Sequence, residues 1–292
     1  MCCQSLRKWL IGFRCFSYRR SPTKILVLTT SQAELDSPLD PNTTKNEFLK
    51  KVEDASGKPV IVTSDPNCSG HAVIKVAKAD QPAHVLLYKP QHESVLPYLV
   101  AYQCSLALRV IQAAPETQYD LVNQPDMESE VLSLMENHAK GNSSIPPHVV
   151  SQLAIQFGHG LGWQLRSMPI AMRLDQGIHE EHPELREFQQ KSVESQLQEN
   201  MHALSPQAKQ IAPEDIVRPN ASMNAAFAKF WAEIMKSPIV FAPYVAAGYS
   251  PVASELLSIN TATPESSDHD RELVVAWAKL LGLDRWFKTK NR

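Results

Sequence analysis

The chain has little glycine, ten residues in 292, and it lacks the glycine-rich patterns of several large enzyme classes. None of GxGxxG, GxxxxGK[ST] and GxSxG is present. The first two patterns wrap backbone N–H groups around phosphates, and the third presents a nucleophilic serine on a sharp turn. The sequence therefore argues against a dinucleotide-binding loop, a phosphate-binding loop and an α/β-hydrolase site.

The sequence also lacks a CxxC motif. The five cysteines are scattered and include no CxxC pair, so neither a zinc knuckle nor a disulfide framework is indicated. We expect free thiols in a reducing cytosol and hence a cytoplasmic protein. Cys104 lies in the most apolar predicted helix, where a thiol is typically inert packing.

No overall excess of one charge exists, because 29 basic and 31 acidic residues leave a net charge of −2. Nucleic-acid binding is therefore not predicted. No run of about 18 apolar residues occurs, so no transmembrane span is predicted either. Ordinary apolar and charged fractions of 43% and 21% fit a protein that buries a core.

Basic residues do gather in the first 24 positions, where no acidic residue interrupts them. One face of a short amphipathic helix there would be formed by Trp9, Leu10, Ile11, Phe13 and Phe16. Three interpretations stay open: a disordered or misassigned start, a helix on a membrane surface or an anionic partner, and an organelle-targeting segment. The residues available for such a peripheral contact are Arg7, Lys8, Arg14, Arg19 and Arg20.

The longest apolar segment spans residues 94–113, in which Arg109 is the only basic residue. Apolar residues at helical spacing on nearly all sides predict a buried helix. Three short strand-like runs precede it, at 59–63, 71–77 and 84–88, separated by turn residues. They predict a small antiparallel three-stranded sheet, with the helix packed on it.

The remaining chain reads as helices broken by prolines. Apolar spacing predicts helices at 45–55, 126–140, 148–167, 170–181, 184–204, 221–235 and 266–281, with Gly57 and Gly282 as stop residues. We expect Pro169 to interrupt a long helix and 208–220 to be an irregular connection. The predicted organisation is a tail over residues 1–40 and one mostly helical α+β domain over 45–287.

The segment AYQCSLALR, residues 101–109, resembles the AHELGHALR stretch of small bacterial zincin metallopeptidases of the repressor-cleaving and toxin-linked type. Zincins share the order of sheet followed by buried helix, and their HExxH motif supplies two zinc-binding histidines and a catalytic glutamate. In this chain Tyr102, Gln103 and Leu106 take those three places. The resemblance therefore implies a zincin-like outline with a degenerate site and no metal cofactor. Without the resemblance, Tyr102 and Gln103 are polar members of a core-facing helix.

A second group of candidates lies in RLDQGIHEEHPELR, residues 173–186. Asp175 and His179 are four apart on one helical face, and His182 follows three later. With Arg109 they would line a pocket, and the resemblance places a third zinc ligand on such a downstream helix. The simpler interpretation is an Asp–His pair on a surface helix.

The expected function is a non-catalytic zincin-like protein that binds an unknown protein or peptide partner. The alternative is an active metal-dependent hydrolase that uses His84, Asp175, His179 or His182. A third possibility is a membrane-peripheral protein directed by its basic N-terminus.

Overall fold

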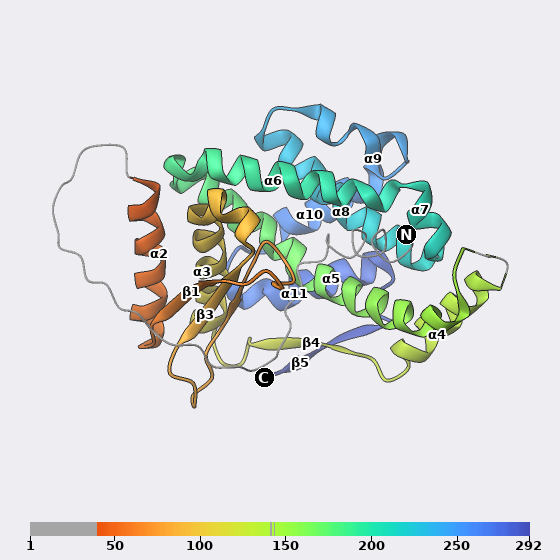
Figure 1. Ribbon diagram of the computed structural model, residues 1–292, viewed down its shortest axis with the longest axis horizontal. Coiled ribbons are helices and arrows are strands. Elements are labelled where there is room, and N and C mark those ends of the chain that lie inside the picture. Colours follow the sequence, from red (N-terminus) through yellow and green to blue (C-terminus); the bar gives the residue numbers. More distant parts are fainter. Residues whose placement is uncertain (1–39, 141, 143) are drawn as a thin grey trace.

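The computed structural model describes residues 40–140, 142 and 144–292 (Figure 1). The interpretations of the basic N-terminal tail lie outside these residues. The first described element, α2 (Pro41–Ser56), begins after Asp40, whose side chain accepts a hydrogen bond from the backbone N–H of Asn42. It ends at Gly57, whose φ of 69° is the left-handed conformation that glycine adopts without strain. The predicted stop at Gly57 is confirmed.

The three predicted strands form one sheet, but it is mixed rather than antiparallel. Strands β1 (Val60–Ser64), β2 (Ala72–Lys75) and β3 (His84–Tyr88) lie in the order β1-β3-β2. Strand β2 pairs antiparallel with β3, whereas β1 pairs parallel with β3. Since each strand reverses the direction of the one before it, inserting β3 between β1 and β2 makes β3 parallel to β1. The expectation of an all-antiparallel sheet was wrong because the pairing order is not sequential.

The central apolar helix is confirmed. A short 3-10 turn, η1 (Pro90–Val95), leads into α3 (Leu96–Gln112), which packs against α2, the sheet and α5. Tyr98, Val100 and Cys104 are fully buried, while Leu106 and Leu108 are half-buried against the core. By length and composition alone, Pro90–Gln112 would be long and apolar enough to cross a membrane. In this structure it is a helix of the protein core.

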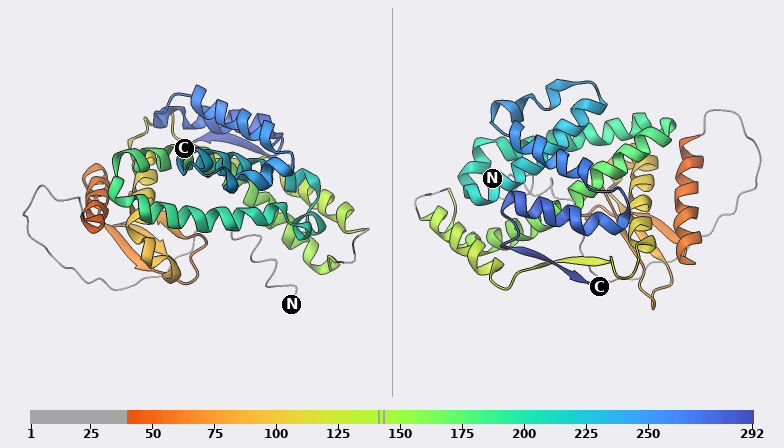
Figure 2. Two further views of the ribbon diagram at one scale, coloured as in Figure 1. Left: turned by 90° about the horizontal axis from the view of Figure 1, so that it is seen from above. Right: turned by 180° about the vertical axis from the view of Figure 1, so that it is seen from behind.

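Helices form most of the rest of the molecule, as predicted (Figure 2). The longest, α5 (Val150–Glu181), follows the turn η2 (Pro147–Val149) and runs through the middle of the molecule. Its glycines allow close packing. A Cβ atom on Gly162 would lie 2.7 Å from the Phe287 ring, and one on Gly158 would lie 2.9 Å from the Met127 sulfur.

Pro169 does not interrupt α5, contrary to expectation, because the helix is buried on both sides of it. Proline removes one helical hydrogen bond, at a cost of about 3 kcal/mol. Packing of the neighbouring Met168 and Ile170 in the core offsets that cost, and the carbonyl of Pro169 accepts a hydrogen bond from Asn260 Nδ2 at 3.0 Å.

The segment 208–220 is also helical rather than irregular. It contains the end of α7 (Pro206–Ile211) and the start of α8 (Glu214–Ile234), so that Pro219 lies inside a helix. Pro219 comes early in α8, and the buried Ala221, Met223 and Phe227 after it hold the helix in place. The predicted helix at 221–235 is therefore only the second part of α8.

A second sheet of two strands was not predicted. Strand β4 (Tyr119–Asn123) pairs antiparallel with β5 (Phe287–Asn291), although they lie far apart in sequence. The expected helices at 126–140 and 266–281 are present as α4 (Met127–Ala139) and as η6 (Ser267–His269) with α11 (Asp270–Leu281). Gly282, at φ 65°, ends α11 as predicted.

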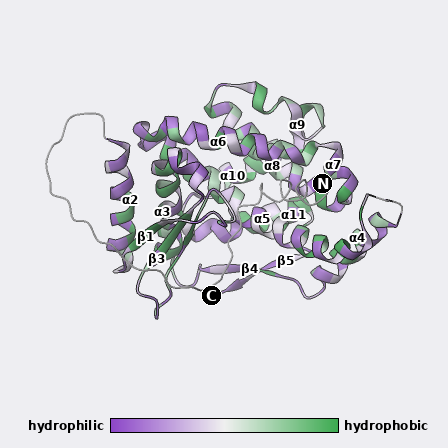
Figure 3. Ribbon diagram, viewed as in Figure 1, coloured by the Kyte–Doolittle hydropathy of each residue, from purple (hydrophilic) through white to green (hydrophobic). Residues whose placement is uncertain are grey.

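The remaining elements cover the core and connect its long helices. They are η3 (Pro183–Leu185), α6 (Arg186–Asn200), η4 (Met201–Leu204), η5 (Pro238–Val240), α9 (Ala242–Ala246) and α10 (Ser250–Ala262). One connected hydrophobic cluster runs through the described residues, from Val52 on α2 through Leu86 and Leu161 to Trp286 near the C-terminus. Apolar residues accordingly lie along the inner faces of the helices and on the sheet (Figure 3).

Candidate functional site

Gln103, which the resemblance aligns with the zincin glutamate, binds the edge of the small sheet. Its side chain is buried; Oε1 accepts a hydrogen bond from the N–H of Ile74 at 3.1 Å, and Nε2 donates one to the carbonyl of Ala72 at 2.8 Å. In an antiparallel pair, alternate residues turn their backbone groups away from the partner strand. The groups of Ala72 and Ile74 thus face the free edge of β2, and the amide of Gln103 satisfies them as a further strand would.

Tyr102, which the resemblance aligns with the first zincin histidine, is a core residue. It is 2% exposed, and its ring centroid lies 6.2 Å from that of Tyr98, one turn earlier. The Tyr98 hydroxyl donates a hydrogen bond of 2.6 Å to Asp175 Oδ1. Asp175, on α5, is fully buried rather than on the surface. The structure therefore brings Asp175 against α3, by way of Tyr98.

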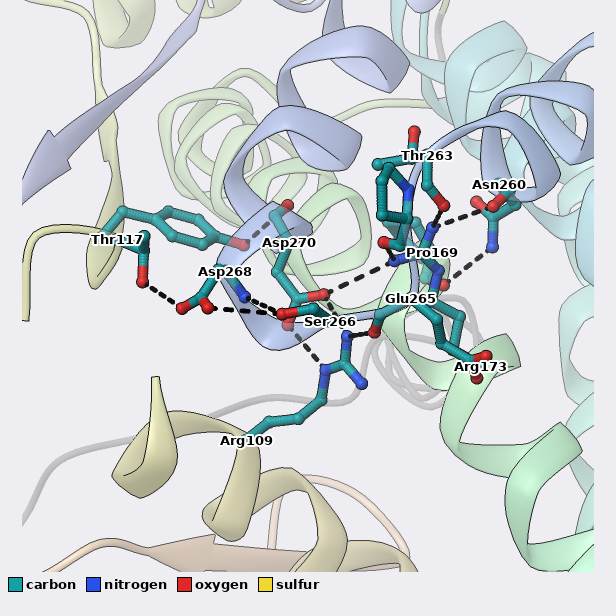
Figure 4. Close-up of polar contacts among 12 residues, drawn as sticks. Arg109, Thr117, Pro169, Arg173, Asn260, Thr263, Glu265, Ser266, Asp268 and Asp270 are labelled. Atoms are coloured by element: carbon teal, nitrogen blue, oxygen red, sulfur yellow. Dashed lines mark hydrogen bonds and ion pairs between the residues drawn. The ribbon is translucent and has the colours of Figure 1, made fainter. Parts of the chain in front are cut away.

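Leu106 and Arg109 complete this segment of α3. Leu106, which the resemblance aligns with the second zincin histidine, packs half-buried against the hydrophobic core. Arg109 makes a two-pronged ion pair with Asp270, from Nε at 2.8 Å and from Nη2 at 2.7 Å, and also donates to the carbonyl of Glu265. Arg109 thus holds α3 to the turn that begins α11 (Figure 4).

Arg173 reaches the same turn from α5. Its guanidinium donates hydrogen bonds to the carbonyls of Asn260, Thr263 and Pro264 at 2.7 to 2.9 Å, and so satisfies the C-terminal end of α10. Its Nη1 lies 3.9 Å from Asp270 Oδ1. Burial lowers the pKa of Arg173 and the charge of Asp270 raises it. Two arginines from separate helices therefore share one buried carboxylate (Figure 4).

Sequence reasoning assigned no role to Arg173 or Asp270. A signal for Arg173 was present, because a lone arginine in the apolar run MPIAMRL requires a buried partner. The partner itself lies 97 positions later and has no local signature.

The two candidate histidines at the end of α5 belong to separate contacts. His179 Nδ1 lies 3.1 Å from Gln189 Oε1, and the carbonyl of His179 accepts a hydrogen bond from Arg186 Nε. His182 Nδ1 lies 3.2 Å from Glu184 Oε1, which also accepts a hydrogen bond from Thr44 on α2. Burial by itself would raise the pKa of the Glu184 carboxyl. The hydrogen bonds from Thr44 and His182 outweigh burial, so the pKa is lowered.

His84, the remaining candidate ligand, stabilises the loop between β2 and β3. Its Nδ1 accepts a hydrogen bond from the N–H of Ala77 at 2.9 Å, so Nε2 carries the proton toward Ser56 Oγ at 2.8 Å. Burial, together with the charge of Lys58, lowers the pKa of His84. The imidazole is therefore neutral and fully used in hydrogen bonds.

The candidate ligands therefore do not converge. Across residues 40–140, 142 and 144–292, no group of three or more His, Cys, Asp or Glu side chains is placed to hold a metal ion. Nor does Cys104 form a nucleophile, because burial raises the pKa of its thiol to about 12.

A hollow of about 620 Å³ lies elsewhere, where α8 begins beside α10 and the end of α11. Val252, Leu280 and Leu281 are its apolar residues; the charged ones are Glu214, Asp215, Arg218, Asp284 and Arg285. None of the predicted site residues lines it. The sequence did carry a signal for this helix end, since two acidic residues directly after Pro213 are typical of a helix start.

Comparison with known proteins adds no relative from which a role could be transferred. No family model, curated protein or solved structure matches this chain.

Proposed function

We propose that this chain is a non-catalytic, zincin-like protein of the cytoplasm that acts by binding a protein or peptide partner. The observation that carries the proposal is the double hydrogen bond of Gln103 to Ala72 and Ile74. At the place where a zincin needs a proton-accepting carboxylate, this chain has an amide. Both ends of that amide are used to hold the sheet edge.

The neighbouring positions support the same proposal. Tyr102 and Leu106 contribute to the core where zincins have metal ligands, and Arg109 is committed to Asp270. The hollow beside α8 has apolar and charged residues side by side, a combination suited to the side chains of a peptide. The buried free thiols Cys68 and Cys104 are in keeping with a cytoplasmic protein.

The test is a zinc titration of the double variant Tyr102→His with Leu106→His. Residues 102 and 106 are one helical turn apart, and histidines there would share one side of α3, as in HExxH. A metal that binds only the folded state raises the melting temperature. We expect the wild type to show no zinc-dependent shift and the double variant to show an upward shift.

The single variant Leu106→His is the matched control, because it supplies one imidazole only. A zinc-dependent rise in the wild type would contradict the non-catalytic proposal. A folded double variant whose melting curve does not respond to zinc would instead remove the zincin relationship, leaving the helical α+β fold.

A further inference from the structure

The two edges of the small sheet differ in how their outward backbone groups are used. The order β1-β3-β2 makes β1 and β2 the edge strands, and the sheet lies with α2 at one end of the described molecule (Figure 1). On β2, the side chain of Gln103 occupies the outward groups of Ala72 and Ile74. The edge of β1 is different, because most of its outward groups are unused.

The hydrogen bonds at the two ends of β1 show which of its residues face outward. The carbonyl of Pro59 accepts a hydrogen bond from β3 at 2.9 Å, and the N–H of Asp65 donates one to β3 at 2.8 Å. Consecutive residues of a strand turn their backbone groups to opposite sides. The N–H and C=O groups of Val60, Val62 and Ser64 therefore point away from the sheet.

These outward groups are accessible and nearly all unpaired. Among the residues that the structure describes, their one hydrogen-bond partner is Glu53, whose carboxylate accepts from the N–H of Val60 at 3.1 Å. Ser64 is exposed, and so is Ile61, at 38%. The strand contains no charged residue, proline or glycine, the usual devices that keep other strands from an edge. It is therefore open to pairing with another extended backbone.

A second copy of β1 is complementary to this edge about a twofold axis through Val62. With the two Val62 residues opposite each other, Ser64 lies opposite Val60 and the strands overlap over their whole length. Hydrogen bonds then join the two Val62 residues and run from each Ser64 N–H to the Val60 carbonyl of the other copy, while Glu53 keeps the Val60 N–H. Ile61 would lie beside Thr63 of the second copy, a pair of β-branched side chains of the kind that stabilises sheets.

The charges that flank β1 favour the same antiparallel arrangement. Lys58 precedes the strand by two residues, and Asp65 follows it directly. In a parallel pair the two Asp65 carboxylates would lie side by side and repel each other. In an antiparallel pair the Asp65 end of one strand meets the Lys58 end of the other, so opposite charges lie near each other.

We propose that the chain self-associates through β1, so that the two small sheets join into one continuous sheet across a symmetric dimer. Such an interface uses the same surface of both copies, as a twofold axis requires. Pairing of one short strand buries little area, so the dimer is weak and depends on concentration. The inference does not depend on the proposed function, which the zinc titration tests separately.

The test is sedimentation equilibrium of the full chain from about 10 μM to about 1 mM, a range that covers weak association. We expect the mean mass to rise toward that of a dimer. Ser64→Pro removes an outward N–H and leaves the bonds to β3 in place. It should weaken the dimer by about tenfold or more, because each copy loses a hydrogen bond to the other. The matched control Ser64→Ala keeps the N–H and should associate like the wild type.

A second variant, Ile61→Lys, keeps every backbone group and places like charges close to the twofold axis. It should also weaken the dimer, whereas Ile155→Lys, at an exposed isoleucine of α5, should not. If Ser64→Pro lowers the melting temperature, Ile61→Lys decides the question. A chain that stays monomeric throughout would overturn the proposal. So would a dimer that neither variant weakens, or one that Ser64→Ala weakens as much as Ser64→Pro.

Discussion

Gln103 combines two hydrogen-bond roles that a carboxylate cannot fill together. Ile74 requires an acceptor and Ala72 requires a donor, and only a side-chain amide offers both in one planar group. Both backbone groups are buried, so they cannot turn to water instead. A glutamate in this position would place a negative charge against the carbonyl of Ala72.

Replacing Gln103 with alanine should therefore lower the free energy of unfolding by about 2 to 4 kcal/mol, since two buried backbone groups lose their partner. Urea unfolding followed by circular dichroism measures this. Gln112→Ala is the control, because Gln112 is exposed near the end of the same helix. Equal effects of the two changes would show that Gln103 does not hold the sheet edge.

His92 is a second residue whose effect can be measured, in this case on how stability depends on pH. Its ring stacks on His71 at 3.8 Å between centroids, and His71 Nε2 lies 3.3 Å from Glu199 on α6. Burial and the neighbouring His71 lower the pKa of His92 from 6.5 to about 4, against the opposing charge of Glu199. The folded chain thus binds this proton less readily than the unfolded chain.

The contribution of His92 to the free energy of unfolding is therefore fully present above pH 6.5. It is lost as the pH falls from 6.5 toward 4, because the unfolded chain takes up the proton first. His92→Phe keeps the stack but cannot titrate. It should reduce the loss of stability over that range by about 1 to 2 kcal/mol, allowing for partial solvent screening. Urea unfolding at several pH values tests this. The exposed His148→Phe is the control, and matching pH profiles for wild type and His92→Phe would refute the assignment.

At the scale of elements, the α10–α11 turn joins helices that are distant in sequence. Asp270 is 6% exposed and receives Arg109 from α3 and Arg173 from α5. A buried ion pair contributes little net free energy, because both charges lose their hydration. Removing one partner is nevertheless strongly destabilising, because the remaining charge stays unpaired in the interior.

Asp270→Asn should lower the free energy of unfolding by about 3 to 5 kcal/mol, since two arginines lose their counter-charge. The control is Asp215→Asn, whose partner Arg285 is also at 2.8 Å but is about half exposed, and it should cost at most about 1 kcal/mol. Urea denaturation compares the two. Similar small costs for both would mean that the turn is not held by its buried charges.

Local sequence signals predicted most helices and the first three strands. They did not predict the two prolines inside helices or the second sheet. Apolar spacing and terminal glycines located α3, α4 and α11, because these features act within a few residues. Pro169 and Pro219 lie inside helices because packing with distant segments outweighs their local cost. Strands β4 and β5 went unpredicted since their pairing joins segments more than 160 positions apart.

At the scale of the whole molecule, the candidate site was harder to predict than the fold. The resemblance singled out Tyr102, Gln103 and Leu106, but their roles depend on where β2 and α5 pack against α3. Asp175 and His179 are four positions apart, yet the Asp175 carboxylate contacts Tyr98 whereas the His179 ring contacts Gln189, whose Nε2 also donates to the Asp175 carbonyl. Such partners are set by tertiary packing, which spacing alone does not encode.

The central claim is that the three positions singled out by the zincin resemblance, Tyr102, Gln103 and Leu106, help to hold the fold together and need no metal. Its most direct test is the zinc content of the purified full-length chain after incubation with zinc and dialysis, measured by atomic spectroscopy. We expect zinc far below one ion per chain, with an unchanged melting temperature in chelator. One zinc ion per chain that survives dialysis would contradict the account and favour a metal-dependent hydrolase.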